Sequence, residues 1–296
     1  MGIGWNPSKD IPDLSGKVIV VTGGSSGLGK ESVHQLVKHN PSKIYLTART
    51  SARGNAAINA IESATPAAKG KIAYLEVDMA SLASVKRAAD RVLTAESRLD
   101  ILMSNAGVMA VPAGVTEDGY ESQFGTNHMG PSLFTKLLLL LLSKTATAPD
   151  SDVHIVNLSS ELFKSAPMGG ILFDSLKTPQ SEISSMARYG QSKLADALHT
   201  HILAQKYPQI KSVALHPSVV NTGLLDTFKK DHPIIGGLVG VVAGIFLTNV
   251  HDGAKRQLWA ATAPSKEVKN GAITKDEALA ERLWEWTNKE LEAKGF

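Results

Sequence analysis

Tyr189 and Lys193 place a phenol and a primary amine four residues apart in the chain. On an α-helix this spacing puts both side chains on one face, one turn apart. A free tyrosine has a pKa of about 10 and rarely exchanges protons at neutral pH. A neighbouring ammonium favours the phenolate and lowers that pKa, so the pair could carry general acid/base catalysis. The spacing alone also fits an ordinary exposed pair, and the surrounding sequence has to decide between the two.

A series of strands and helices must position this pair. From residue 17 onward, short runs rich in β-branched residues alternate with amphipathic stretches. Near-continuous apolar strands separated by helices indicate a parallel sheet covered on both faces. With right-handed crossovers, the predicted fold is α/β, a doubly wound parallel sheet of the Rossmann type. Strands are predicted at 17–22, 43–48, 71–77, 99–104, 153–159 and 211–216, and helices at 26–39, from the second strand to about 63, at 81–97, at 119–143 and at 186–207.

The chain is predicted to form a single domain over 1–296. No proline- or serine-rich linker, internal repeat or low-complexity tract interrupts the alternation. An N-terminal extension covers 1–16, and two irregular inserts occupy 161–185 and 223–251. Both inserts follow strands, at the edge of the sheet where open α/β folds bind ligands. We therefore expect these inserts to cover a substrate.

The composition limits the class of protein. Hydrophobic residues make up 43% and charged residues 20%, as is typical of soluble globular proteins. A net charge of +3, without clustered lysines and arginines, argues against a nucleic-acid partner. With no cysteine, disulfide frameworks, thiolate catalysis and cysteine-ligated metals are excluded. The absence of cysteine also fits a reducing compartment, and a cytoplasmic location is expected.

Membrane contact is not expected. The N-terminus lacks a basic region followed by an apolar one, so a signal peptide is not predicted. The apolar, glycine-rich stretch 234–247 is shorter than the roughly 17–25 residues of a membrane-spanning helix. A buried or substrate-covering segment is the favoured interpretation, with monotopic membrane contact as the alternative.

A glycine-rich turn follows the first predicted strand. Gly23, Gly27 and Gly29 lie between that strand and the first helix, with the spacing Gly-x-x-x-Gly-x-Gly. Glycines permit a tight turn and close approach of the backbone, and a helix N-terminus offers N–H groups to a pyrophosphate. This placement predicts a dinucleotide site.

Arg49, at the end of the second predicted strand, indicates which nucleotide is bound. An acidic residue at this point would bind the ribose 2′-hydroxyl of NAD. The sequence Thr47-Ala48-Arg49-Thr50 instead offers a guanidinium that could hold a 2′-phosphate. NADP(H) is therefore the predicted cofactor, and the alternative is that Arg49 is a solvated surface residue.

Taken in order, these motifs resemble the short-chain dehydrogenase/reductase family, from about residue 16 to 286. The nearest group is the retinol dehydrogenase-like and WW-domain oxidoreductase-like one, which includes many fungal carbonyl reductases. The matching residues are Thr22-Gly23, Gly27 and Gly29, Asp78, Asn105-Ala106-Gly107, Asn127, Ser159-Ser160, Tyr189, Lys193 and His216-Pro217.

The resemblance implies a role for each matching residue. Tyr189 would be the general acid/base, and Lys193 would lower its pKa and bind the nicotinamide ribose. Ser160, rather than Ser159, would hydrogen-bond the substrate carbonyl, and Asn127 would steady a water in a proton relay. Asp78 would contact the adenine, Asn105 and Gly107 would line the cofactor, and Thr222 would bind the nicotinamide amide. The complete cofactor set is Gly23, Ser25, Ser26, Gly27, Leu28, Gly29, Arg49, Asp78, Asn105, Ala106, Gly107, Tyr189, Lys193, Pro217, Val220 and Thr222.

Three departures from the family pattern bear on this set. Ser104 stands where an asparagine is usual and can still hydrogen-bond. Ser218 follows Pro217 in place of a glycine, which could shift the loop beside the nicotinamide. A tyrosine- and proline-bearing stretch usual near Ile273 is absent, which changes the C-terminal edge of the pocket.

The remaining histidines and tryptophans are expected to be structural. His199 and His201 are two residues apart on a predicted helix, so they point to different faces, and no third ligand accompanies them. They are interpreted as surface or packing residues, and no metal site is predicted. Trp284 and Trp286 lie on a C-terminal helix and are interpreted as packing anchors.

The predicted function is that of an NADP(H)-dependent oxidoreductase, a carbonyl reductase or alcohol dehydrogenase, acting on a moderately large apolar ketone, aldehyde or alcohol. The alternatives are a catalytically silent dinucleotide-sensing regulatory protein and a membrane-associated retinoid or steroid dehydrogenase. The six leucines at 137–142 make their helix hydrophobic on all sides. The resemblance implies that this helix could join a subunit interface in a homodimer or homotetramer; burial within one subunit is the alternative.

Overall fold

A six-stranded parallel sheet forms the centre of the molecule. The computed structural model describes residues 4–217, 249–271 and 276–296. Within them the strand order is β3-β2-β1-β4-β5-β6, which confirms the predicted doubly wound sheet. The order reverses between β1 and β4, and the turns at the carboxyl ends of these strands meet there. The strands are β1 (Val18–Val21), β2 (Lys43–Ala48), β3 (Ile72–Glu76), β4 (Ile101–Ser104), β5 (His154–Leu158) and β6 (Lys211–Leu215).

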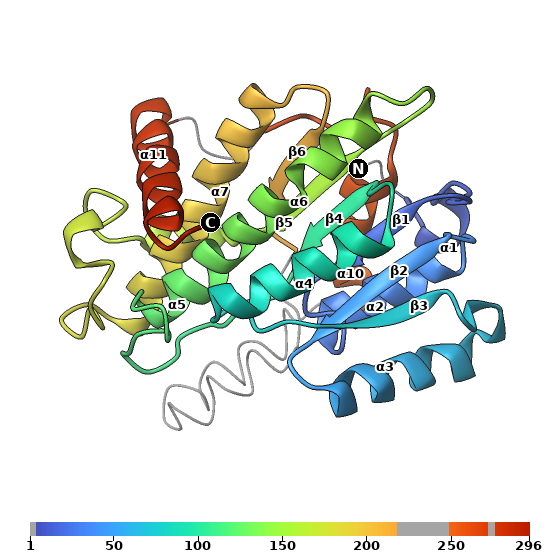
Figure 1. The fold of residues 1–296 in the computed structure, drawn as a ribbon, viewed down its shortest axis with the longest axis horizontal. Helices are drawn as coiled ribbons and strands as arrows, with labels where there is room; N and C mark the ends of the chain where they lie inside the picture. Colours follow the sequence, from blue (N-terminus) through green and yellow to red (C-terminus); the bar gives the residue numbers. More distant parts are fainter. Residues whose placement is uncertain (1–3, 218–248, 272–275) are drawn as a thin grey trace.

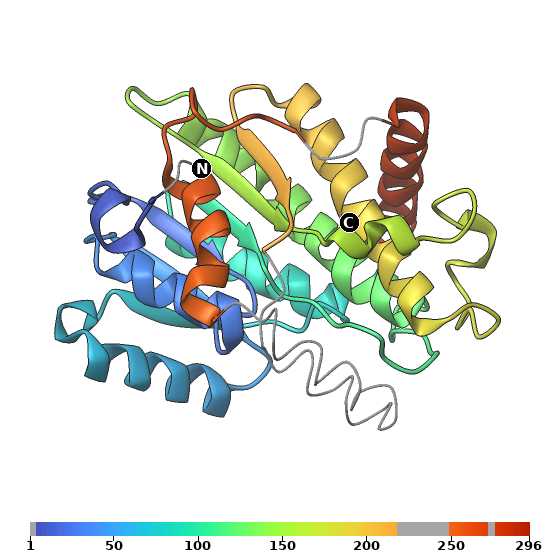
Figure 2. The same ribbon diagram turned by 180° about the vertical axis from the view of Figure 1, so that it is seen from behind.

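Helices cover both faces of the sheet (Figures 1 and 2). Alternate residues of β1 explain why: Val18 and Val20 join one hydrophobic cluster, while Ile19 and Val21 join the other. All four are buried, so the strand is apolar on both faces. The first cluster is covered by α4 (Leu82–Ala95), α6 (Gly130–Ala146), α7 (Ser185–Lys206) and α11 (Glu277–Ala293), and the second by α2 (Gly27–Val37), α3 (Ser51–Ala64) and α10 (Val250–Thr262).

Side-chain caps fix where several helices begin. Ser81 accepts a hydrogen bond from the backbone N–H of Ser84 at the start of α4, and Ser184 accepts one from Ala187 at the start of α7. A serine at this position satisfies one of the otherwise unpaired N–H groups of the first turn. The cap at Ser184 matters for the site because it sets the register of α7.

The helix predicted at 119–143 differs from the observed structure. It begins with one turn, α5 (Ser122–Phe124), continues through a π-helical turn (Gly125–Met129), and becomes regular only in α6. Glu121 caps α5 by accepting hydrogen bonds from the N–H groups of Gln123 and Phe124. Gly130 packs so closely on the backbone carbonyl of Met79 that a side chain there would collide with it. The predicted start was too early because residues 115–121 form a bridged turn.

The irregular parts of the chain have distinct places. The N-terminal extension contains α1 (Pro7–Asp10) and is attached through Ile11 and Leu14, which are buried. The insert 161–185 contains two 3₁₀ turns, Glu161–Ser165 and Phe173–Ser175. Most of the insert 223–251 lies outside the described residues, and its last two residues belong to α10.

The leucine run lies within α6 and is not buried on every side. Leu138, Leu141 and Leu142 are buried, whereas Leu140 is 81% exposed. The C-terminal helix α11 runs alongside α7 (Figure 1). Among the described helices, none combines the length and the apolar character needed to cross a membrane.

Candidate active site

The first half of α7 brings Tyr189 and Lys193 to the carboxyl end of β5. Both residues are 6% exposed. The Lys193 Nζ atom lies 6.0 Å from the centre of the Tyr189 ring. The same ammonium donates a hydrogen bond of 2.8 Å to the carbonyl of Leu158, the last residue of β5. The phenol and the amine therefore share one buried environment at the edge of the sheet where ligands bind in this fold.

The two serines after β5 have different partners. The Ser159 hydroxyl donates to the backbone carbonyl of Lys193 at 2.8 Å and so ties β5 to α7. The Ser160 hydroxyl accepts from the N–H of Leu162 at 3.2 Å, and its hydrogen bond to Tyr189 favours the phenolate. Of the two serines, Ser160 is the one whose side chain acts on the pKa of Tyr189.

The charges around Tyr189 oppose one another. Burial raises its pKa, and the negative charge of Asp196 acts in the same direction; the ammonium of Lys193 and the hydrogen bond from Ser160 lower it. The net shift is upward, so the isolated chain keeps Tyr189 as a neutral phenol at pH 7. A neutral phenol is the form that can donate a proton.

Asp196 completes a buried ion pair that was not predicted from the sequence. Its Oδ2 atom accepts a hydrogen bond of 2.8 Å from Lys193 Nζ. Burial by itself disfavours the ammonium, but the attraction of Asp196 and Tyr189 outweighs it and raises the pKa of Lys193. Burial also raises the pKa of Asp196, to about 6, against the effect of Lys193. The i,i+3 spacing of these two residues on one helix was a readable signal for the pair.

Asn127 lies in the π-helical turn and holds two neighbouring elements together. Its Oδ1 accepts from the N–H of Val108 at 2.8 Å, and its Nδ2 donates to the Val108 carbonyl and to the Ser192 hydroxyl, both at 2.9 Å. Ser192 in turn donates to the carbonyl of Tyr189 at 2.8 Å. Ser192 is a further residue that was not predicted, although it lies between the two catalytic candidates. The π turn is a local distortion often found at functional sites.

The glycine turn forms a backbone cradle at the carboxyl end of β1. Gly23 and Gly27 have φ of +64° and +53°, which other residues rarely adopt. A side chain at Gly29 would collide with the Gly23 carbonyl. Ser26 is the N-cap of α2, but its side chain makes no capping hydrogen bond. The first N–H groups of α2 have no side-chain cap and fit a pyrophosphate.

The other residues of this turn, Ser25, Ser26 and Leu28, differ in how exposed they are. Ser25 is half-buried and Ser26 is exposed. The Leu28 side chain packs into the core, so only its backbone can face a ligand.

The segment after β4 connects the glycine turn to the candidate catalytic residues. The N–H groups of Asn105 and Ala106 both donate to the Thr22 hydroxyl at 2.9 Å. The Asn105 side chain donates to the Thr22 carbonyl at 2.9 Å, which holds the ends of β1 and β4 together. A Cβ atom on Gly107 would lie 3.0 Å from Asn127 Oδ1 and 3.7 Å from Lys193 Nζ. Gly107 thus lies at the junction between the glycine turn and the candidate catalytic residues.

Arg49 and Asp78 lie at the outer end of the same edge. Arg49 follows β2 directly and is exposed. Thr47, two residues earlier, accepts a hydrogen bond of 3.0 Å from the N–H of Gly23, so the end of β2 adjoins the glycine turn. Asp78 is half-buried and accepts from the N–H of Ala80 at 3.0 Å. Pro217 is the last residue described after β6; Ser218, Val220, Thr222 and Ile273 lie outside the described residues.

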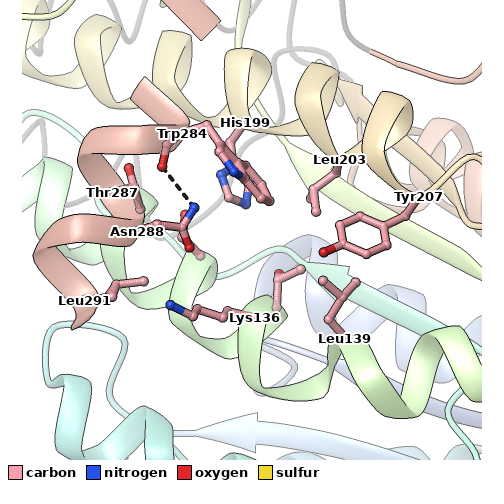
Figure 3. Close-up of a pocket in the computed structure, with 11 residues that line it drawn as sticks. Lys136, Leu139, His199, Leu203, Tyr207, Trp284, Thr287, Asn288 and Leu291 are labelled. Carbon is pink, nitrogen blue, oxygen red and sulfur yellow. Dashed lines mark hydrogen bonds between the residues drawn. The ribbon is translucent and has the colours of Figure 1, made fainter. Parts of the chain in front are cut away.

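The second half of α7 borders a separate cavity of about 120 Å³ between α6, α7 and α11 (Figure 3). None of the predicted site residues lines it. His199 stacks on Trp284 with ring centres 5.0 Å apart, and burial lowers the pKa of His199 to about 4. His201, on another face, pairs with Glu277 at 2.6 Å. His199 is thus a packing residue and His201 a surface one.

The remaining candidates are also packed into the core. Trp286 makes edge-on contacts with Phe124 and Phe173. His128 hydrogen-bonds Thr287 of α11 at 2.9 Å. Within the described ranges, no group of three histidine, aspartate or glutamate side chains is arranged to hold a metal ion.

Comparison with known proteins shows similarity along most of the chain. A family model described as short chain dehydrogenase matches residues 17–233. A short-chain dehydrogenase/reductase from Phomopsis amygdali is 36% identical over 96% of this chain and 92% of its own length. Retinol dehydrogenase 14 from Homo sapiens is 32% identical over 92% and 85%, respectively. A solved structure from Mycobacterium paratuberculosis, of an uncharacterised protein, superposes with a TM-score of 0.73 and 26% identity over 98% of both chains. The range matched by the family model includes both the glycine turn and Lys193.

Proposed function

Because the chain belongs to the short-chain dehydrogenase/reductase family and is an oxidoreductase, we propose that it interconverts a ketone or aldehyde with an alcohol, using NADP(H) and Tyr189 as the general acid/base. The observation that carries this proposal is the convergence of Tyr189, Lys193 and Ser160 at the end of β5. Their buried setting gives the phenol a hydrogen-bond partner and a nearby positive charge. These two features oppose the rise in the pKa of the phenol that burial causes, and they favour the phenolate that proton transfer leaves behind.

Each residue then has a defined part in the reaction. When bound, NADPH supplies the hydride to the carbonyl carbon of the substrate. Ser160 donates a hydrogen bond to the carbonyl oxygen, and Tyr189 delivers a proton to that oxygen as negative charge develops on it. Lys193 stabilises the phenolate that is left behind. Asn127 holds the Val108 segment against α7, which keeps the two ends of the site in register.

The residues of the nucleotide end fit a dinucleotide. A backbone cradle with no room for a side chain at Gly29 suits close approach of a pyrophosphate. Arg49 is exposed beside that cradle and would pair with a 2′-phosphate, which supports NADP(H) rather than NAD(H). Asp78 would contact the adenine at the same edge.

The substrate is proposed to be apolar and of moderate size. The insert 161–185 packs against the first half of α7, next to Ser160, and this position supports its role as a substrate-covering element. A relative named retinol dehydrogenase 14 supports an apolar alcohol or carbonyl compound as the substrate class. The cysteine-free composition supports a cytoplasmic location.

The test is consumption of NADPH with a panel of ketones and aldehydes, repeated with NADH. Tyr189→Phe is expected to lower kcat by roughly 10²–10⁴-fold, the usual contribution of a positioned general acid. Tyr207→Phe, at the C-cap of the same helix, is the matched control and is expected to keep the activity. Unchanged turnover in Tyr189→Phe would contradict the catalytic role, and tight cofactor binding without any turnover would favour a dinucleotide sensor. Equal rates with NADH would contradict the role of Arg49.

A further inference from the structure

Lys193 has a buried anionic partner, Asp196, which has no part in the proposed reaction as described above. The Asp196 Oδ2 atom lies 2.8 Å from Lys193 Nζ, and the two side chains are only 9% and 7% exposed. The Leu158 carbonyl, also at 2.8 Å, takes a second hydrogen bond from the same ammonium. An ammonium has three N–H groups, so one remains for the active site.

We propose that Asp196 is a positioning residue for the reaction, which keeps Lys193 charged and oriented and sets how strongly that charge acts on Tyr189. The proposal rests on the proposed function of Tyr189 and Lys193. Its first part follows from geometry, because the Leu158 carbonyl and the Asp196 carboxylate occupy two of the three N–H groups of Nζ and so fix the direction of the third. Its second part follows from electrostatics, because Asp196 and Lys193 act on the phenol with opposite signs.

The size of the coupling follows from the spacing of the charges. Lys193 Nζ is 6.0 Å from the centre of the Tyr189 ring, and Asp196 Oδ2 is 2.8 Å from Nζ. Removing the carboxylate charge while keeping its shape leaves the ammonium unopposed, so the phenolate becomes more stable. At the effective dielectric constant of a protein interior this is expected to lower the pKa of Tyr189 by about one pH unit.

The other ionisable groups on the packed elements do not compete with this effect. Burial lowers the pKa values of His128, in the π turn, and of His199, on α7, so both are neutral above pH 6.5. At the start of α7 lie the pairs Lys164–Glu161, exposed on the 3₁₀ turn, and Arg188–Glu121, which is buried and joins α7 to the N-cap of α5. Towards its end, His201–Glu277 and Lys206–Glu281 join α7 to α11. In each of these pairs, the positive charge of one side chain is offset by the negative charge of its partner. Among the described residues, Asp196 is therefore the one whose substitution changes the net charge next to Lys193.

The experiment compares Asp196→Asn with Asp252→Asn in the full chain. Asp252 forms the same kind of i,i+3 pair with Lys255, but at the surface of α10. The pKa of Tyr189 is read from the ultraviolet absorbance of tyrosinate, as the difference between each protein and the same protein carrying Tyr189→Phe. We expect a decrease of about one pH unit in Asp196→Asn and no change in Asp252→Asn. An unchanged pKa in Asp196→Asn overturns the proposal.

The pH–rate profile of alcohol oxidation supplies an independent readout. Its rising limb, which reports the phenolate of Tyr189, is expected to move to lower pH by the same amount in Asp196→Asn. A merely structural role would lower the rate at every pH without moving the limb, and that result overturns the proposal. Because the absorbance titration needs no turnover, it still tests the charge coupling in a chain that reduces no carbonyl compound, where the proposed function itself would fail.

Two further variants keep the test decisive if Asp196→Asn does not fold. Asp196→Ser removes the charge with a smaller side chain and is expected to reproduce the shift. Asp196→Glu keeps the charge and is expected to leave the limb near its original pH. If the rising limb moved by the same amount in Asp196→Ser and in Asp196→Glu, the shape of the side chain and not its charge would be responsible. That result would overturn the proposal.

Discussion

The two halves of α7, divided after Asp196 into residues 185–196 and 197–206, bury ionisable side chains in opposite ways. In the first half, Lys193 and Asp196 are buried as a pair, with both charges hydrogen-bonded. In the second half, His199 is equally buried, yet neither ring nitrogen has a hydrogen-bond partner in the part of the chain that the structure describes. The first arrangement holds charge in the core, whereas the second excludes it.

This difference shows that burial of an ionisable group does not by itself mark a catalytic site. His199 is neutral because burial lowers its pKa to about 4, and its ring serves as a flat surface stacked on Trp284. Lys193 stays charged because an anion and a carbonyl replace the water it lost. The half with the candidate catalytic residues is recognised by groups that converge on one point, and the packing half by aromatic contacts around a cavity (Figure 3).

The largest effect is expected when the buried pair is broken. Lys193→Met leaves Asp196 buried without its partner, which is expected to lower the free energy of unfolding by about 3–5 kcal/mol. It also removes the positive charge beside Tyr189, so activity should be lost. Urea unfolding at pH 7 measures the first effect, and NADPH consumption the second.

Lys206→Met is the matched control in the second half of α7. Lys206 pairs with Glu281 at 3.5 Å, and the two side chains are 40% and 42% exposed. Exposed pairs contribute about 0–1 kcal/mol, so a small change is expected. Similar losses of stability in both variants would show that the two halves of the helix do not differ as the structure indicates.

The fold could be predicted from the sequence because its signals are local. Strands such as Lys43–Ala48 are short, mostly apolar runs, and their alternation with helices was enough to predict the doubly wound parallel sheet, although not the order of its strands. The π turn at Gly125–Met129 could not be predicted, because it depends on contacts with distant residues. Asn127 reaches across to Val108, and Gly130 packs against the backbone of Met79. A local periodicity carries no information about such contacts.

An effect of intermediate size is expected on the pH dependence of folding stability, through His199 in the second half of α7. Unfolded histidine has a pKa of about 6.5, and His199 in the folded chain one of about 4. Between these values the unfolded chain binds the additional proton, so stability falls as the pH is lowered from 6.5 to 4. His199→Phe keeps the aromatic contact and is expected to remove roughly 2–3 kcal/mol of that loss. Thermal or urea unfolding at pH 7 and at pH 4.5 measures the change.

Two neighbours set the controls for this prediction. His128 is buried with a lowered pKa and acts in the same direction, so part of the acid sensitivity should remain in His199→Phe. Asp196, whose pKa is raised to about 6, acts in the opposite direction over the same pH range. Asp196→Asn should therefore steepen the acid-dependent loss that His199→Phe reduces. A parallel change in both variants would contradict the contrast between the two halves.

The site was predictable in part for the same reason. Tyr189, Lys193 and the glycine turn occur at fixed local spacings, so their types and order could be read directly. Asp196 also has a local spacing to Lys193, but whether it is buried depends on the packing of α7 against the sheet. The stacking of His199 on Trp284 joins residues 85 positions apart and has no signal in either segment.

The smallest change in stability is expected at Gly190, next to Tyr189. Alanine in an open helix would stabilise it by about 1 kcal/mol relative to glycine. At this position a Cβ atom would lie 2.7 Å from both the Ala166 nitrogen and the Leu162 oxygen, so the insert must shift. Overpacking of this kind costs about 1–3 kcal/mol, which leaves a net loss of about 1 kcal/mol. Because the insert begins directly after Ser160, kcat/KM for the carbonyl substrate should fall as well.

Ala204→Gly, in the second half of α7, is the control. It measures the difference in helix propensity between alanine and glycine at a position that does not contact the insert. It removes a methyl group where no insert packs and is expected to cost about 1 kcal/mol without changing kcat/KM. If Gly190→Ala instead stabilised the chain by that amount and left kcat/KM unchanged, the insert would not be held against the first half of α7. The close approach at Gly190 would then have no part in shaping the substrate side of the site.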